Sequence, residues 1–163
     1  MIATSLKMDI RKVAQSRIKE MDVENLTFGK LFSDHMLTAD YIDGQWTNIA
    51  IGPYEKMLMA PSISALHYGQ AIFEGMKAYK TDSGDVLISR PYDNWKRMNI
   101  SAERMAMPNV PEDLFIDGLS ELMRLDKNWI PNKPGCSLYI RPFLFSTDEY
   151  IGVKPSETYK FII

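Results

Sequence analysis

The chain has 163 residues, enough for one domain with a buried core. Its 19 Lys and Arg residues are balanced by 21 Asp and Glu, so no basic excess predicts a nucleic-acid partner. Cys136 is the single cysteine, which excludes an internal disulfide and a cysteine-built metal site and is typical of a reducing compartment. No apolar run approaches the roughly 18 residues that span a bilayer, so we expect a cytoplasmic protein with no membrane partner.

The first 25 residues are polar and mixed. Ile10, Val13, Ala14 and Ile18 have a weak helical spacing, which is equally typical of an extended arm that lies on a partner. The sequence leaves both readings open, and residues 1–25 are treated as an N-terminal arm.

Two β-hairpins are predicted after this arm. Residues 35–42 and 45–51 are rich in β-formers and flank Asp43-Gly44, a dipeptide typical of tight hairpin turns. Residues 76–80 and 85–89 flank Asp82-Ser83-Gly84 in a similar way.

Two consecutive helices follow the hairpins. The first should begin at Pro91, where a missing N–H costs nothing, and should end by Pro108. Its expected buried stripe is Trp95, Met98, Ala102 and Met105. The second should begin at Pro111 and its acidic neighbours, which suit the positive end of a helix dipole. Its expected stripe is Phe115, Leu119, Leu122 and Met123.

The last part of the chain returns to β-structure. Residues 136–146 and 159–163 each predict a strand. Strands, two helices and further strands predict an α+β fold, in which an antiparallel or mixed sheet is layered with the helices, because hairpins cannot make parallel pairs. An end within an apolar β run is unusual for a natural terminus, so we expect a longer parent protein.

The strand at residues 136–146 carries a candidate binding face. A period of two places Tyr139, Arg141 and Phe143 on one face and Leu138 and Ile140 on the other. The aliphatic face should meet the core, whereas an arginine beside a phenol suits a carboxylate. A half-exposed face with an ion-paired arginine is the ordinary alternative, and the pattern alone favours it.

Other candidates are weaker on the pattern alone. Arg97 lies at the boundary of the first helix's buried face, where a solvated arginine is ordinary. Tyr68 and Phe73 lie near Gly69 and Gly75, which could let the backbone approach a ligand, although core aromatics fit as well. Two histidines are too few for a histidine-based metal site or triad, and the usual phosphate-loop and hydrolase motifs are absent. No metal site is predicted.

Residues 64–79, SALHYGQAIFEGMKAY, resemble the signature of fold-type IV branched-chain amino acid aminotransferases. Further stretches follow the family's order: residues 32–37, Arg90-Pro91 with Asn94 and Arg97, residues 138–142 and residues 151–153. The resemblance covers residues 26–163, which look like the small N-terminal domain of such an enzyme, and it excludes residues 1–25.

The resemblance implies a pyridoxal 5'-phosphate cofactor, whose phosphate Arg97 would bind. It implies that Tyr139 and Arg141 recognise acid groups, Arg141 chiefly the second carboxylate of glutamate or 2-oxoglutarate. The apolar wall for the branched substrate side chain would be Phe32, Tyr68, Phe73, Ile151 and Val153. Tyr68, Ile151 and Val153 would reach into the other subunit's site of a homodimer.

The implied reaction transfers an amino group between leucine, isoleucine or valine and 2-oxoglutarate. In the family, the lysine that bonds the cofactor lies in a second domain, beyond residue 163. We therefore expect no catalytic lysine in this chain, and an inactive isolated fragment.

Two alternatives remain open. A D-amino acid aminotransferase or an aminodeoxychorismate lyase shares the fold type, although the Tyr139/Arg141 strand and residues 32–37 favour the branched-chain enzymes. A non-catalytic dimerisation or binding module is the other alternative, and the sequence downstream of residue 163 would decide between them.

Overall fold

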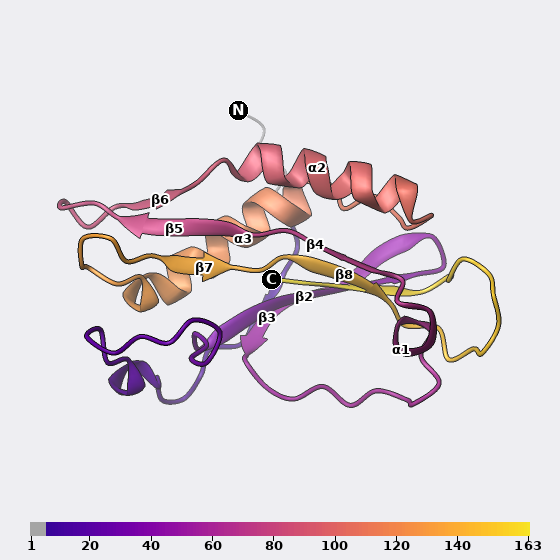
Figure 1. Cartoon of the computed structure of the whole chain (residues 1–163), viewed down its shortest axis with the longest axis horizontal. Coiled ribbons are helices and arrows are strands. Elements are labelled where there is room, and N and C mark those ends of the chain that lie inside the picture. Colours follow the sequence, from indigo (N-terminus) through magenta and orange to yellow (C-terminus); the bar gives the residue numbers. More distant parts are fainter. Residues whose placement is uncertain (1–5) are drawn as a thin grey trace.

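A computed structural model describes residues 6–163, which form two β-sheets with two long helices packed against them (Figure 1). The six-stranded sheet has the order β1 (Asp9–Ile10), β3 (Gln45–Pro53), β2 (His35–Ile42), β9 (Tyr159–Ile162), β8 (Phe143–Ser146) and β4 (Ala71–Phe73). The three-stranded sheet has the order β6 (Val86–Ile88), β5 (Met76–Lys80) and β7 (Leu138–Ile140). The helices are α1 (Ser64–Tyr68), α2 (Pro91–Arg104) and α3 (Glu112–Asp126), with 3₁₀ turns at Ile18–Glu20 and Lys127–Trp129.

The predicted α+β class is confirmed. Both hairpins form, β2 with β3 and β5 with β6, and Asp43 and Gly44 each have a positive φ in the first turn. Among the described strands, β1 and β3 are the pair that runs parallel, so the six-stranded sheet is mixed. No helix in residues 6–163 is long and apolar enough to cross a membrane.

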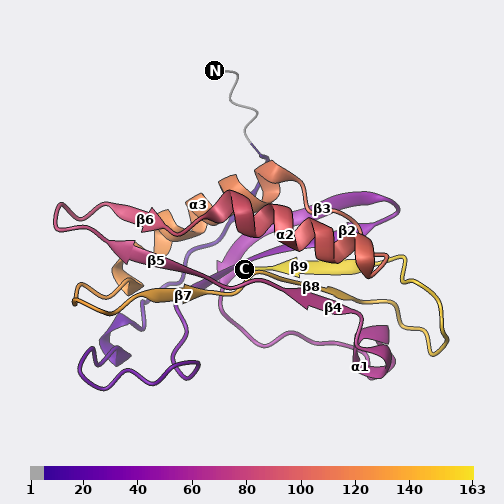
Figure 2. The ribbon, with the colours of Figure 1, turned by 45° about the horizontal axis from the view of Figure 1, so that its top comes forward.

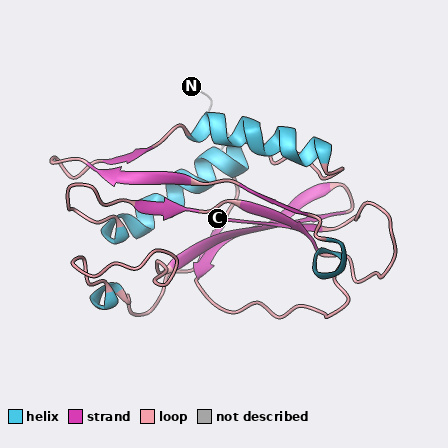
Figure 3. Ribbon diagram, viewed as in Figure 1, coloured by secondary structure: helices cyan, strands magenta, loops and turns pink. Residues whose placement is uncertain are grey.

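The two consecutive helices lie side by side (Figures 2 and 3). The stripe predicted for α3 is buried throughout. In α2, Met98 and Ala102 are buried, but Met105 lies beyond the end of the helix and is exposed, so its predicted place in the stripe is wrong. The helix ends at Arg104, and the backbone turns at Ala106 with a positive φ. Asn99 binds the backbone N–H and C=O of Val110, which holds the following segment against α2.

The core fills the space between α3 and the six-stranded sheet. Phe115 of α3 stacks on Phe161 of β9, with 5.9 Å between ring centroids, and both are fully buried. A Cβ added to Gly118 would lie 2.9 Å from a methyl carbon of Leu37 in β2. Gly118 therefore lets α3 approach the sheet closely, which places the helix end at Asp126 beside the start of β2.

The predicted single strand over residues 136–146 is wrong in one respect. The chain leaves the three-stranded sheet after β7, passes Arg141 and Pro142, and enters the six-stranded sheet as β8. The neighbouring chain segment crosses in the same way, from β4 in the six-stranded sheet to β5 in the three-stranded sheet. The two segments keep the same residue pairing on both sides of the crossing, with Phe73 opposite Phe143 and Met76 opposite Ile140. Pro142 has no N–H to complete the ladder, so one bond, from Glu74 N–H to Pro142 C=O, spans the break.

Within residues 6–25, the arm forms the short strand β1 and a 3₁₀ turn at Ile18–Glu20, and β1 lies along the chain's own sheet. β1 pairs with β3, and the Arg11 N–H donates to Ile51 C=O. Beyond it, the Val13 N–H donates to His35 Nε2, so the ring proton lies on Nδ1 and is donated to Asp126, 2.6 Å away. The weak helical spacing therefore does not give an α-helix, because backbone groups of the arm bond to the sheet and to buried side chains.

Candidate functional site

Phe73, Tyr139 and Arg141 come together where the chain crosses between the sheets. The Arg141 guanidinium donates to Tyr139 Oη from Nη2 and Nε, at 2.7 and 3.1 Å. It lies 4.2 Å above the ring of Phe73, and both Phe73 and Arg141 are exposed. An exposed guanidinium seated between a phenol and an aromatic ring can bind a carboxylate with its outer edge. Ile140 is buried and Leu138 is half-buried, in agreement with the predicted aliphatic face.

Gly75 makes this arrangement possible. The residue lies opposite Arg141 in the register, and the ring of Tyr139 leans across it. A Cβ on residue 75 would lie 2.3 Å from Tyr139 Oη and 3.0 Å from its Cζ, so any side chain would displace the phenol. The glycine of the Phe-Glu-Gly stretch thus has a steric role beside Arg141.

Gly75→Ala should therefore move the Tyr139 ring and break its bonds with Arg141. We expect a loss of about 1–3 kcal/mol in unfolding free energy, measured by urea denaturation. Gly75→Ala introduced into a Tyr139→Ala background removes the clash and should cost much less. Equal costs in the two backgrounds would mean that Tyr139 does not exclude the methyl group.

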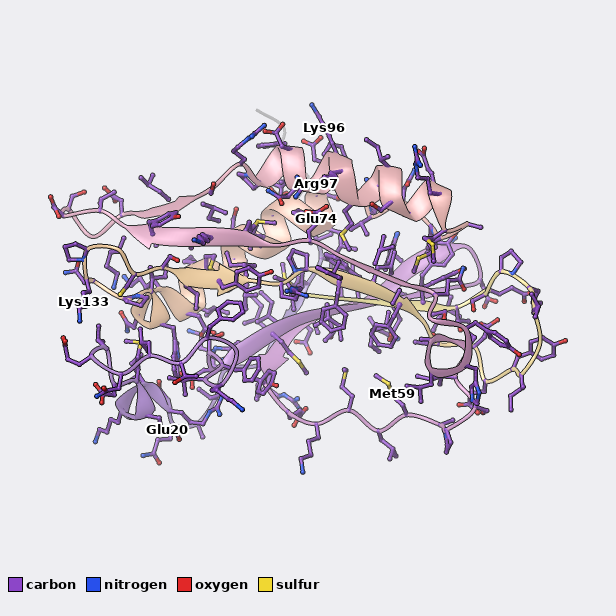
Figure 4. All side chains as sticks on the ribbon, in the orientation of Figure 1. Glu20, Met59, Glu74, Lys96, Arg97 and Lys133 are labelled. Atoms are coloured by element: carbon purple, nitrogen blue, oxygen red, sulfur yellow. The ribbon has the colours of Figure 1, made fainter. Side chains whose placement is uncertain are left out.

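Arg97 reaches the same segment from the other side. Phe73 lies against Arg141 and Gly75 against Tyr139, whereas Glu74 between them is buried and pairs with Arg97 of α2 (Figure 4). Nε and Nη2 of Arg97 donate to the two carboxylate oxygens of Glu74, and Nη2 also donates to Asn94 Oδ1. Hydrogen bonding to Glu74 raises the pKa of Arg97. The guanidinium is therefore charged and fixed in orientation.

The fixed guanidinium of Arg97 borders a hollow of about 290 Å³ between α2 and residues 75–77. Arg90 and Lys77 also line this hollow, with Asp93 as the acidic member. Glu74 and Asn94 occupy Nε and Nη2, which leaves the N–H groups of Nη1 for a ligand, and 64% of the Arg97 side chain is exposed. A cationic hollow with a pre-oriented guanidinium at its edge fits a phosphate group.

Phe32 belongs to a separate aromatic pair. Its ring stacks on Tyr54, with 4.8 Å between centroids and an interplanar angle of 10°. Nearby, Phe28 packs edge-on against Tyr139 at 5.0 Å. The segment that carries Phe28 and Phe32 is thereby joined to the Tyr139–Arg141 cluster.

Tyr68, Ile151 and Val153 lie at the other end of the sheets, where α1 is drawn at the right of Figure 1. Helix α1 and the loop at residues 147–158 are joined by three buried hydroxyl groups. Ser64 Oγ of α1 bonds to Ser146 Oγ at 2.9 Å and to Ser156 Oγ at 2.7 Å. All three candidate side chains are exposed, Val153 to 94%. Helix α1 and the loop at residues 147–158 thus form one unit that presents apolar side chains outward.

Asp148 closes the base of this loop. It accepts hydrogen bonds from Thr158 Oγ1 and from the N–H groups of Glu157 and Thr158. Burial raises the pKa of Asp148, but these bonds outweigh it and hold the pKa below its usual 3.8. Because the charged form is favoured in the folded state, its stabilisation is complete above pH 3.8 and is lost as the pH falls through the lower folded value.

Asp148→Asn should consequently destabilise the chain near neutral pH and have a shrinking effect in acid. We expect the difference in thermal midpoint between wild type and variant to be constant above about pH 5 and to decrease below pH 3.8. Scanning calorimetry over this pH range measures the difference. Asp82→Asn, in an exposed turn, is the control, and a difference that grows in acid would contradict the assignment.

The structure thus groups the predicted site residues in four places, one of which is the Phe32–Tyr54 pair. It brings together Phe73, Tyr139 and Arg141, places Arg97 across the backbone from them, and leaves Tyr68, Ile151 and Val153 at a distance with no covering side chains. A second hollow, of about 470 Å³, lies beside the Asp43-Gly44 turn and is lined by none of the predicted residues. Sequence reasoning missed Glu74, whose signal is a carboxylate at a position that alternation assigns to the buried face.

Comparison with known proteins identifies the family. No protein-family model matches the chain. The chain is 48% identical to branched-chain-amino-acid transaminase 1 of Bacillus subtilis over 143 residues, which is 87% of this chain and 40% of that protein. It is 41% identical to a branched-chain-amino-acid aminotransferase of Mycolicibacterium smegmatis over 152 residues, 92% of this chain and 41% of that protein.

This chain belongs to the branched-chain amino acid aminotransferase family. It spans about two fifths of the length of the curated relatives that it matches.

Solved structures of branched-chain amino acid aminotransferases share the fold. The Escherichia coli protein aligns with a TM-score of 0.56 and 24% identity, over 77% of this chain and 40% of that one. The T.th. protein, complexed with N-(5'-phosphopyridoxyl)-L-glutamate, aligns with a TM-score of 0.52 and 28% identity, over 76% and 39% of the two chains. The two sheets and two long helices therefore form a fold that solved branched-chain amino acid aminotransferases share.

Proposed function

We propose that this chain is the N-terminal small domain, residues 26–163 preceded by an arm, of an enzyme that transfers an amino group between leucine, isoleucine or valine and 2-oxoglutarate. The enzyme would bind pyridoxal 5'-phosphate and would act in the cytoplasm as a homodimer. The family supports an aminotransferase, and the exposed arginine of the Phe73–Tyr139–Arg141 cluster supports an acid substrate.

Arg97 would hold the cofactor's phosphate. Its orientation comes from Glu74 and Asn94, so little freedom is lost when its outer N–H groups bind an anion. Pyridoxal phosphate supplies the electron sink for amino-group transfer when bound. The residue that bonds the cofactor would come from the remainder of the protein, and we expect the 163-residue chain alone to be inactive.

Arg141 and Tyr139 would bind the acid groups of the substrates. The cation–π contact with Phe73 places the guanidinium at the rim of an apolar surface, so the same site can accept an aliphatic chain or a second carboxylate. Phe32 and Phe73 would contact the branched side chain from within one subunit. Tyr68, Ile151 and Val153, exposed on the unit formed by α1 and the 147–158 loop, would contact it from the other subunit.

The observation that carries this proposal is the contact of Arg141 with both Tyr139 and Phe73, in a chain 48% identical to a branched-chain transaminase. The proposal is tested on the full-length protein, which is the product of the complete reading frame that contains this chain. Purified with pyridoxal phosphate, it should convert leucine and 2-oxoglutarate to glutamate and the 2-oxo acid of leucine, with isoleucine and valine also accepted.

The same assay includes the 163-residue chain, D-alanine and aminodeoxychorismate. Activity of the full-length protein with D-alanine or aminodeoxychorismate, and none with leucine, would assign another fold-type IV reaction. A reading frame without a cofactor-bonding lysine would support a non-catalytic module. Turnover by the 163-residue chain alone would refute its expected inactivity.

A further inference from the structure

The N-terminal arm contributes a side chain to the segment that carries Phe32. Arg17 Nη2 donates to the carbonyl oxygens of Ser33, at 2.9 Å, and Phe32, at 3.3 Å. The Arg17 N–H donates to Asp34 Oδ1 at 2.9 Å, and Arg17 Nε lies 3.9 Å from the same oxygen. One residue of the arm therefore contacts three consecutive residues, Phe32 to Asp34, immediately before β2.

Arg17 also contacts the aromatic partner of Phe32. Its guanidinium carbon lies 5.9 Å from the ring centroid of Tyr54, which stacks on Phe32. Tyr54 is itself fixed to this region, because its N–H donates to Asp34 C=O at 2.8 Å. Arg17 thus contacts the Tyr54 ring directly and the backbone of Phe32 through its carbonyl oxygen.

Asp34 gives Arg17 a rigid anchor. The side chain is buried and accepts hydrogen bonds from the indole of Trp129, from the Arg17 N–H and from Ser16. Burial raises the pKa of Asp34, but these hydrogen bonds together hold the pKa below its usual value, so the carboxylate stays charged near neutral pH. Arg17 therefore connects a fixed, buried carboxylate with an aromatic pair that is partly exposed.

We propose that Arg17 is a positioning residue, which holds Phe32 and Tyr54 in place and thereby sets the affinity of the site for the aliphatic side chain of the substrate. This inference rests on the function proposed above. It gives a role to the arm, which contains none of the motifs on which the family resemblance was recognised. A guanidinium suits this role because its planar fork can bind two adjacent carbonyls and lie over a ring, which an ammonium group cannot do equally well.

The first test uses kinetics of the full-length enzyme with leucine as amino donor. Arg17→Met should raise KM for leucine about tenfold, the loss expected for hydrogen bonds from one charged group, with kcat within about twofold. Arg17→Lys should restore part of the affinity. Lys19→Met, an exposed cation two residues along the arm, is the matched control and should leave both constants unchanged.

A double-mutant cycle separates positioning from general destabilisation. If Arg17 acts through Phe32, the Arg17→Met/Phe32→Ala enzyme should have the same KM as Phe32→Ala. Additive effects, or a KM unchanged in Arg17→Met, would overturn the inference. A leucine-inactive wild type would instead refute the proposed function.

Hydrogen exchange tests the positioning without reference to activity. In Arg17→Met, amides of residues 32–34 should exchange about tenfold faster than in wild type and in Lys19→Met, while those of α3 stay unchanged. Equal exchange at residues 32–34 would overturn the inference even if the enzyme proves to be a transaminase. Faster exchange in α3 as well would show that Arg17 has only a general structural role.

Discussion

Arg97→Met in the full-length protein is expected to weaken pyridoxal phosphate binding by about 10- to 100-fold, because a charged donor to the phosphate is lost. The variant also leaves Glu74 buried without its cation. The double variant Arg97→Met/Glu74→Gln removes this charge, so it should fold and should show the same weak binding. Titration of the apoprotein with the cofactor, followed by visible absorbance, measures the affinity.

Lys96→Met is the matched control for Arg97. Lys96 is the preceding residue of α2 and is exposed, and Figure 4 shows it pointing away from Glu74. Its loss should change the affinity by less than about twofold. If Arg97→Met/Glu74→Gln binds the cofactor as tightly as wild type, the phosphate is held elsewhere.

Asp126→Ala should lower the unfolding free energy by about 2–5 kcal/mol, because two buried donors of His35 lose their acceptor at about 1–3 kcal/mol each. Asp126 is 1% exposed and accepts two bonds from His35, from its N–H at 2.9 Å and from Nδ1 at 2.6 Å. Both donors would be buried without a partner. Urea denaturation followed by circular dichroism measures the loss.

The same helix supplies the control for Asp126. Asp117 lies on the exposed face of α3, and Asp117→Ala should change the stability by about 0.5 kcal/mol or less. A cost for Asp126→Ala as small as that for Asp117→Ala would mean that water replaces the carboxylate. Asp126→Ala should also release the N-terminal arm, because the His35 ring that Asp126 holds accepts a hydrogen bond from the Val13 N–H.

The local parts of the fold could be predicted because local chemistry decides them. The Asp43-Gly44 turn and the stripe of α3 follow from positive φ and from apolar spacing. The division into two sheets could not be predicted from local chemistry. Residues 71–80 alternate between exposed and buried positions without a break, although the chain changes sheet at Glu74. In the segment at residues 136–146, Pro142 indicates that the strand is interrupted. A proline does not indicate which sheet the chain joins after the interruption.

The site was predictable where side chains are neighbours in one strand. Tyr139 and Arg141 are two residues apart, so alternation predicted their shared face, and they do bond to each other. Phe73 joins them from a strand more than 60 residues away, a contact that alternation within one strand could not predict. Arg17 had no signal, because a polar arm with a weak helical spacing gives no indication of the carbonyls that it will contact.

The paired crossing between the sheets has a mechanical consequence. Residues 74–75 and 141–142 change sheet side by side, and the bond from Glu74 N–H to Pro142 C=O is the tie between them. A twist of one sheet against the other would bend both crossings about this tie. Phe73 of β4 would move with the six-stranded sheet, whereas Tyr139 of β7 would move with the three-stranded sheet. Arg141 lies in the crossing between them and contacts both, so its grip on the two rings depends on the flexure of two short linkers.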